Sequence, residues 1–156
     1  MSYTLVVIES PYAPSIPYPT SGCRCDAAGD PSVIARSVCC NYCTDRAQWH
    51  YELSRNIAYA RDAMKDSLNR GEAPFVSHLL YTQPDVLDDT IPEEREHGIR
   101  AGWAWRQVAQ KTVVYTDLGI SGGMQYGIDD ANDCRCLIEY RSLPDWADEK
   151  ESSDGR

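Results

Sequence analysis

A glycine-rich turn, Ser121-Gly122-Gly123, is the stretch of this sequence best suited to hold an anion. It follows an apolar segment at 112–116 and opens a helical pattern that includes Met124. The first N–H groups of a helix have no acceptor within the helix, and the helix dipole adds partial positive charge there. The turn therefore predicts a phosphate site at Ser121, Gly122, Gly123 and Met124. The alternative is a simple helix cap at Ser121.

Further candidate ligand contacts follow the predicted strands, because ligands of parallel sheets bind at the carboxyl ends of the strands. These candidates are Ser10, Pro11, Tyr12, His78 and Asp117. For Tyr12 the alternative is packing beside Pro11, and for His78 it is a structural role. Asp88 and Asp89 are further candidates, with solvated loop acids as the alternative.

Five of the seven cysteines fall between positions 23 and 43. The patterns Cys-x-Cys and Cys-x-x-Cys supply two close pairs of thiolates, as tetrahedral zinc requires. Buried free thiols are the alternative, and disulfides are disfavoured in a reducing compartment. The sequence thus leaves open a structural zinc held by Cys23, Cys25, Cys40 and Cys43, and no other cofactor is expected.

Apolar runs alternate with helical patterns along the chain. Strands are predicted at 3–8, 74–77, 112–116 and 137–140. Helices are predicted at 45–69 with Thr44 as N-cap, from a capping box at Thr90-Ile91-Pro92-Glu93 to about Gln110, and from Ser121 to about Asp133. This order predicts an α/β fold with three layers and a flavodoxin- or Rossmann-like parallel sheet of four to five strands.

One domain is expected at 1–143, with a Cys-rich loop insertion at 13–44 after the first strand and an acidic tail at 144–156. The net charge of −9 argues against nucleic acid as a partner. No apolar run is long enough to cross a membrane, and the N-terminus lacks the features of a signal peptide, so we expect a cytoplasmic protein. We also expect a homo-oligomer.

Five segments together resemble the nucleoside 2-deoxyribosyltransferase-like superfamily, and its uncharacterised phage and actinobacterial group most closely. They are VVIESPYA, APFVSHLLYTQ, LDDTIPEEREHGIRAGWAW, VVYTDLGISGGMQYGIDDA and IEYRSLP. The resemblance covers about residues 3–12 and 53–143. It implies a pocket for a nucleoside or nucleotide, and either deoxyribosyl transfer or N-glycosidic cleavage of nucleoside monophosphates as the activity.

The resemblance also implies a catalytic Glu six residues after a phosphate-binding Ser. Ser121 matches that Ser, but Gly127 stands at the position of the Glu. A second family carboxylate falls near Trp103, where no acid stands. The pocket is therefore expected to be kept and the catalytic pair lost, and Gly127→Glu is expected to restore some cleavage. The remaining acids near the rim are Glu9, Asp88, Asp89 and Asp117, of which Asp117 and Asp88 are the first candidates for catalysis.

Three functions are compatible with these residues. The first is a weakly catalytic or non-catalytic protein that binds, and thereby sequesters, a nucleotide-like small molecule. The second is an N-glycosidase or deoxyribosyltransferase that uses a relocated acid. The third is an interaction module in which the Cys-rich insertion binds metal. For Arg95 and Arg100, helix-surface ion pairs are favoured over contacts with phosphate.

Overall fold

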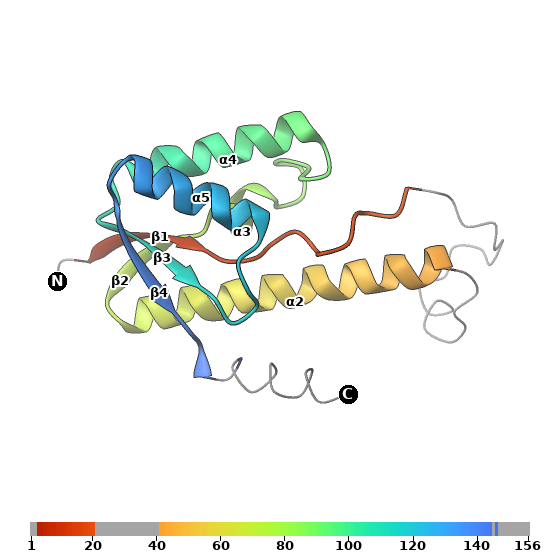
Figure 1. The fold of residues 1–156 in the computed structure, drawn as a ribbon, viewed down its shortest axis with the longest axis horizontal. Coiled ribbons are helices and arrows are strands. Elements are labelled where there is room, and N and C mark those ends of the chain that lie inside the picture. Colours follow the sequence, from red (N-terminus) through yellow and green to blue (C-terminus); the bar gives the residue numbers. More distant parts are fainter. Residues whose placement is uncertain (1–2, 21–40, 145, 147–156) are drawn as a thin grey trace.

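A four-stranded parallel sheet forms the centre of the protein, in a computed structural model that describes residues 3–20, 41–144 and 146. The strands are β1 (Thr4–Glu9), β2 (Glu72–Phe75), β3 (Lys111–Tyr115) and β4 (Leu137–Arg141), in the order β2-β1-β3-β4 (Figure 1). All three neighbouring pairs run parallel. The predicted α/β fold is confirmed.

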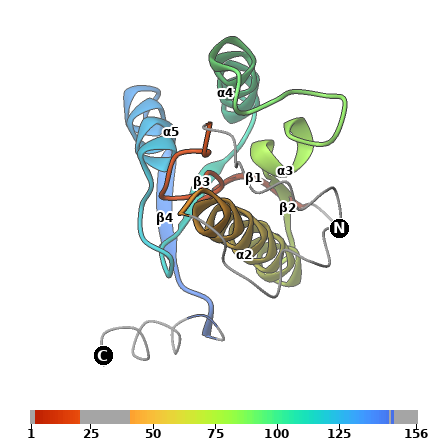
Figure 2. The ribbon, with the colours of Figure 1, turned by 90° about the vertical axis from the view of Figure 1, so that its right-hand side faces the viewer.

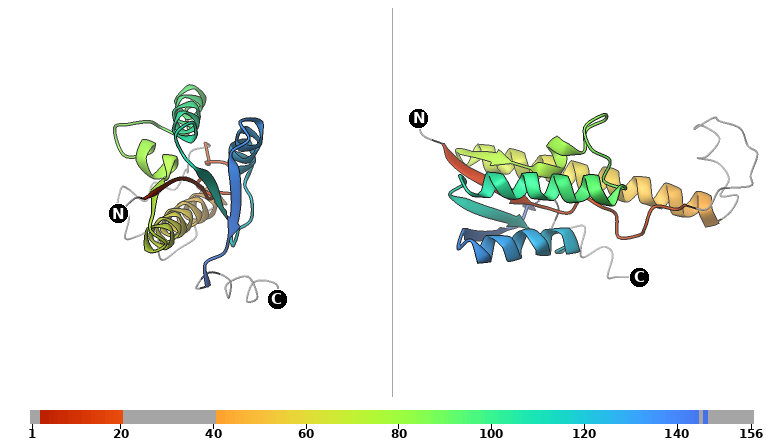
Figure 3. Two further views of the ribbon diagram at one scale, coloured as in Figure 1. Left: turned by 90° about the vertical axis from the view of Figure 1, so that its left-hand side faces the viewer. Right: turned by 90° about the horizontal axis from the view of Figure 1, so that it is seen from above.

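Helices cover both faces of the sheet and make three layers. Helix α2 (Asn41–Asn69) lies along one face, while α4 (Pro92–Arg106) and α5 (Gly122–Asp133) lie side by side on the other (Figures 2 and 3). The short α3 (Ser77–Tyr81) follows β2 and packs against α4. This arrangement leaves the carboxyl ends of β1 and β3 between α2 and the α4–α5 pair.

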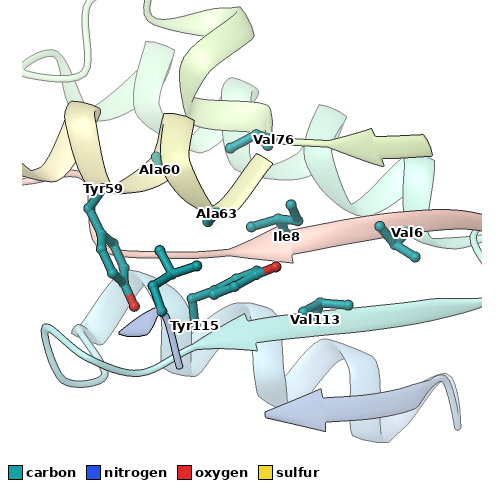
Figure 4. Close-up of a cluster of buried hydrophobic side chains, with 9 residues drawn as sticks. Val6, Ile8, Tyr59, Ala60, Ala63, Val76, Val113 and Tyr115 are labelled. Carbon is teal, nitrogen blue, oxygen red and sulfur yellow. The ribbon is translucent and has the colours of Figure 1, made fainter. Parts of the chain in front are cut away.

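The larger core lies between the sheet and α2. Alternate residues of a strand point to the same face, so Val6 and Ile8 of β1 join Val113 and Tyr115 of β3. They pack against one stripe of α2, formed by Tyr59, Ala60 and Ala63 (Figure 4). A second, smaller cluster on the opposite face joins Val114 to Met124 and Ile128 of α5.

Helix boundaries differ from the predictions at three places, the start of α2 and both ends of α4. Helix α2 begins at Asn41, so Thr44 lies inside the helix and is not its N-cap. The predicted capping box before α4 does not form, since Ile91 occupies the N-cap position without a side-chain cap. Instead, Asp88 Oδ1 accepts hydrogen bonds from the backbone N–H and hydroxyl of Thr90, at 2.9 and 2.6 Å.

Helix α4 ends at Arg106, before the predicted end at about Gln110. The backbone N–H of Gln110 donates to the Leu5 carbonyl at 2.9 Å, and its side-chain oxygen accepts from the Leu5 N–H. These bonds to β1 draw the chain into the sheet and stop the helix.

Two predictions concern residues that the structure describes only in part. The zinc site depends on Cys23, Cys25 and Cys40, which lie outside the described residues, while Cys43 lies in α2. Of the acidic tail, only its first residue and Trp146 are described. The Trp146 ring packs against Tyr59, with centroids 5.0 Å apart, and its indole N–H donates to Asp62. None of the described helices combines the length and the apolar character that a membrane crossing requires.

Candidate functional site

A cavity of about 820 Å³ opens at the carboxyl ends of β1 and β3. Its lining comes from the end of β1, from the middle of α2 and from the facing sides of α3, α4 and α5. Of the predicted ligand contacts, the residues that line it are Ser10, Pro11, Tyr12, His78, Ser121, Gly122, Gly123 and Met124. The topology of the sheet thus brings these separated segments to one site, as parallel strands require.

The N-terminus of α5 forms one wall of the cavity. Ser121 is its N-cap, as predicted: the Ser121 hydroxyl accepts a hydrogen bond from the Met124 N–H at 3.3 Å. The Gln125 N–H donates to the Ser121 carbonyl at 2.9 Å. This leaves the N–H groups of Gly122 and Gly123 without an acceptor inside the helix. The Met124 side chain itself is buried in the smaller core, so its contribution to the wall is structural.

A guanidinium group lies beside this helix terminus. Arg95 Nη2 is 3.4 Å from the point where a Cβ on Gly123 would stand. Asp89 holds Arg95 through an ion pair, and both residues line the cavity. Arg100 does form the expected surface pair, with Glu96, but Arg95 turns toward α5. The sequence did not reveal this placement, since it depends on how α4 packs beside α5.

Ser10, Tyr12 and His78 form a second wall. The Ser10 hydroxyl and His78 Nε2 are 3.2 Å apart, and the Tyr12 and His78 rings pack with centroids 5.4 Å apart. Burial lowers the pKa of His78 to about 4, so the imidazole is neutral at pH 7. This wall offers uncharged hydrogen-bonding groups and an aromatic face.

The two acids first considered for catalysis lie elsewhere, because neither belongs to the described lining of this cavity. The buried Asp117 carboxylate accepts hydrogen bonds from the Tyr59 hydroxyl at 2.7 Å and the Leu143 N–H at 2.9 Å, next to the larger core. Asp88 organises the loop before α4 and borders a separate hollow. Both carboxylates therefore have structural hydrogen-bonding roles.

A carboxyl group that the sequence analysis ranked lower, Glu9, lies at the cavity floor. Glu9 ends β1 on the face toward α4 and α5, and its side chain is 18% exposed. Arg106 Nη2 donates to Glu9 Oε1 at 2.5 Å, and the same guanidinium pairs with Asp130 of α5. Arg106 Nε also donates to Thr112 at 3.1 Å, so the fully buried guanidinium is held from three sides.

The pKa of the Glu9 carboxyl is well above that of an exposed glutamate. Burial raises its pKa to about 7, and Asp130 adds to the rise, while the Arg106 guanidinium acts in the opposite direction. Both the acid and the carboxylate are therefore populated near neutral pH. A carboxyl with such a pKa inside a cavity is typical of functional sites, although ion-pair networks also shift pKa values.

Gly127 of α5 provides the space that the Glu9 carboxyl occupies in the cavity. A Cβ on Gly127 would overlap the Glu9 carboxyl group, so the absence of a side chain at Gly127 lets this carboxyl lie against α5. The carboxyl group of Glu9, from the end of β1, thus lies where a side chain on Gly127 of α5 would begin. Gly127→Glu would bring a second carboxyl group against Glu9. The expectation that this variant restores cleavage stays a prediction.

Comparison with known families identifies one match. The profile of a domain of unknown function (DUF7768) matches residues 38–141, two-thirds of the chain. The chain belongs to the DUF7768 family. No curated protein and no solved structure matches it. The DUF7768 segment contains Arg95, Arg106 and the Ser121 turn, whereas Glu9, Ser10 and Tyr12 precede it. The cavity therefore combines the matched DUF7768 segment with β1.

Proposed function

We propose that the protein binds a phosphorylated, nucleotide-like small molecule in the cavity of about 820 Å³. The observation that carries the proposal is the position of Arg95, whose guanidinium lies beside Gly123 at the N-terminus of α5. A guanidinium and the N–H groups of a helix terminus together suit a phosphate group. The size of the cavity is in the range of small-molecule sites.

The rest of the cavity suits the uncharged part of such a ligand. Tyr12 provides an aromatic surface for a base or sugar, and Ser10 with neutral His78 provides hydrogen-bonding groups. We propose that binding sequesters the ligand in the cytoplasm, with the protein acting as a homo-oligomer. Light scattering of the purified protein tests the oligomeric state.

Calorimetric titration with inorganic phosphate, nucleosides and nucleoside 5′-monophosphates tests the proposal. We expect the monophosphates to bind more tightly than the nucleosides. Gly123→Asp places a negative charge at the helix terminus, and Arg95→Gln removes the guanidinium. Each variant should weaken monophosphate binding by about tenfold or more, since hydrogen bonds to charged groups contribute about 1.5–3 kcal/mol.

The matched control is Arg100→Gln, which removes a guanidinium from the same helix at an exposed ion pair. It should leave binding unchanged. Equal affinity for nucleosides and monophosphates, or full binding by Gly123→Asp, would contradict the phosphate site.

The metal-binding alternative concerns residues outside the described part of the chain and stays a prediction. Elemental analysis of protein purified without chelators tests it, with about one zinc per chain as the expected result.

A further inference from the structure

We propose that Glu9 binds the hydroxyl groups of the ligand's sugar, so that the cavity selects ribonucleoside over 2′-deoxyribonucleoside 5′-monophosphates. This selectivity rests on the proposed function, because the phosphate must first occupy the N-terminus of α5. Glu9 is then a specificity-determining residue, which contacts the bound ligand without changing it.

The Glu9 carboxyl has one oxygen that is engaged within the protein and one that is not. Arg106 Nη2 donates to Oε1 at 2.5 Å, and no described residue donates to Oε2. Every fully buried side-chain oxygen or nitrogen in the described part of the chain has a hydrogen-bond partner. Oε2 is therefore accessible, and Glu9 lines the cavity. A ligand in the cavity can donate a hydrogen bond to this oxygen.

The distance along α5 between two contacts suits a sugar that carries a 5′-phosphate. Arg95 lies beside Gly123, and the Glu9 carboxyl lies against Gly127. Residues four apart lie on the same side of a helix and are separated by roughly 6 Å along its axis. The hydroxyls on C2′ and C3′ of a nucleoside 5′-monophosphate lie about as far from its phosphorus. With the phosphate at Gly123, these hydroxyls therefore reach Glu9.

The position of Glu9 at the cavity floor lets its carboxylate discriminate between ligands. A bound ligand covers the floor and removes the water that otherwise solvates Oε2. A ribose hydroxyl replaces that water with a hydrogen bond to a charged acceptor, whereas the hydrogen on C2′ of a deoxyribose does not. A site built around a hydroxyl rejects ligands that lack it, because its acceptor is then left without a donor. Acidic side chains bind the ribose 2′-hydroxyl in dinucleotide-binding folds by the same interaction.

The charged groups around Glu9 determine at which pH this interaction is strongest. Arg106 of α4 and Asp130 of α5 face its carboxyl, and Asp89, Arg95 and neutral His78 line the same cavity. Because burial raises the pKa of Glu9 to about 7, the carboxylate prevails above this pH and the protonated carboxyl below it. The carboxylate is the stronger acceptor, so the preference for ribose should increase as the pH rises through about 7.

Calorimetric titration of the full chain with paired ribo- and 2′-deoxyribonucleoside 5′-monophosphates at about pH 8 tests the proposal. Each ribonucleotide should bind about 10- to 100-fold more tightly than its deoxy counterpart, as expected for one hydrogen bond to a charged group. The measure is the ratio of the two dissociation constants, because the phosphate and the base are common to both ligands. At about pH 5.5 the ratio should be smaller, because Glu9 is then protonated.

Two substitutions of Glu9 and one control connect this ratio to the residue. Glu9→Ala removes the acceptor and should reduce the ratio to less than about threefold, mainly by weakening the binding of ribonucleotides. Glu9→Gln keeps the size of the side chain but loses the charge, so it should give an intermediate ratio. Glu96→Ala removes a carboxylate from an exposed ion pair on α4 and should leave the ratio unchanged.

The outcomes separate the selectivity from the proposed function. If the wild type binds the deoxyribonucleotides as tightly as the ribonucleotides, or if Glu9→Ala and Glu9→Gln both keep the full ratio, Glu9 does not select the ligand and the binding function remains. If monophosphates of neither kind bind, the proposed function itself fails.

Discussion

Two clusters of charged side chains, each around a buried guanidinium, lie on opposite faces of the same sheet. The α2-face cluster consists of Glu72, Lys111, Glu139 and Arg141, and it ties β2, β3 and β4 together. The cavity cluster consists of Glu9, Arg106 and Asp130, and it joins β1 to α4 and α5. Both contain two carboxylates, but the α2-face cluster has two cations and the cavity cluster has one.

The pKa values of the carboxyl groups follow this difference in the number of cations. Hydrogen bonds from Arg141, supported by Lys111, lower the pKa values of Glu72 and Glu139 to about 2. At Glu9, burial is the largest effect and a single guanidinium shared with Asp130 does not offset it, so the pKa rises to about 7. The same residue types thus give carboxylates that stay ionised at neutral pH in the α2-face cluster, and a carboxyl group, Glu9, that titrates near neutral pH in the cavity cluster. The number of cations per carboxylate and the access to a cavity decide between the two.

The largest effect on stability is expected when the α2-face cluster loses the guanidinium of Arg141. Arg141→Met leaves the buried Glu72 carboxylate with Lys111 and Ser67 as partners. Breaking a buried ion pair by removing one partner destabilises a protein by about 3–5 kcal/mol. We expect a loss of this size in the free energy of unfolding, measured by urea denaturation.

The control for this variant is Arg100→Met, which breaks the exposed pair with Glu96. Exposed pairs contribute about 0–1 kcal/mol, so its stability should stay close to that of the wild type. An equal loss of stability in the two variants would show that the α2-face cluster stabilises the fold no more than an exposed ion pair does.

An intermediate effect is expected for Arg106→Met in the cavity cluster. At pH 8 the variant leaves the Glu9 carboxylate buried without its cation, and we expect a loss of about 2 kcal/mol. At pH 5 Glu9 is protonated in the folded wild type, because its pKa is raised to about 7, so less charge remains to be compensated. The loss should therefore shrink between pH 8 and pH 5. A loss that is independent of pH would assign the role of Arg106 to packing alone.

The smallest effect, of opposite sign, is expected for Glu9→Gln. A carboxyl with a raised pKa binds its proton more tightly when folded, so the wild type loses stability as the pH rises from about 4.5 to about 7. The glutamine variant lacks this loss. It should be more stable than the wild type by about 1 kcal/mol at pH 8 and equally stable at pH 4.

His78 has the opposite linkage, because its pKa is lowered from 6.5 to about 4 on folding, and stability is lost as the pH falls through this range. That loss is shared by both proteins and cancels in the comparison of Glu9→Gln with the wild type. Thermal melts of the two proteins across this pH range measure the difference. A less stable glutamine variant at pH 8 would place Glu9 among the structural ion pairs.

Local patterns in the sequence were sufficient to predict the four strands, the three longer helices and one part of the site, but not the short helix α3. The apolar runs that became β1 and β3, and the serine before Gly122-Gly123, act through neighbouring residues, so the strands and the α5 cap were predictable. The collection of Ser10, Tyr12 and His78 followed from the rule that parallel strands end at one edge.

The charged groups of the site depend instead on contacts between distant segments. The sequence analysis named Glu9 only as one acid near the rim, and nothing near it in the chain indicates that its carboxyl occupies the space left by Gly127, or that Arg106 of α4 holds it there. Likewise, only the packing of α4 beside α5 directs Arg95 to Gly123, and only the core around Tyr59 engages Asp117. Hydrophobic periodicity and capping are properties of short segments, whereas ion pairing and burial depend on which segments meet, and that is decided by the tertiary structure.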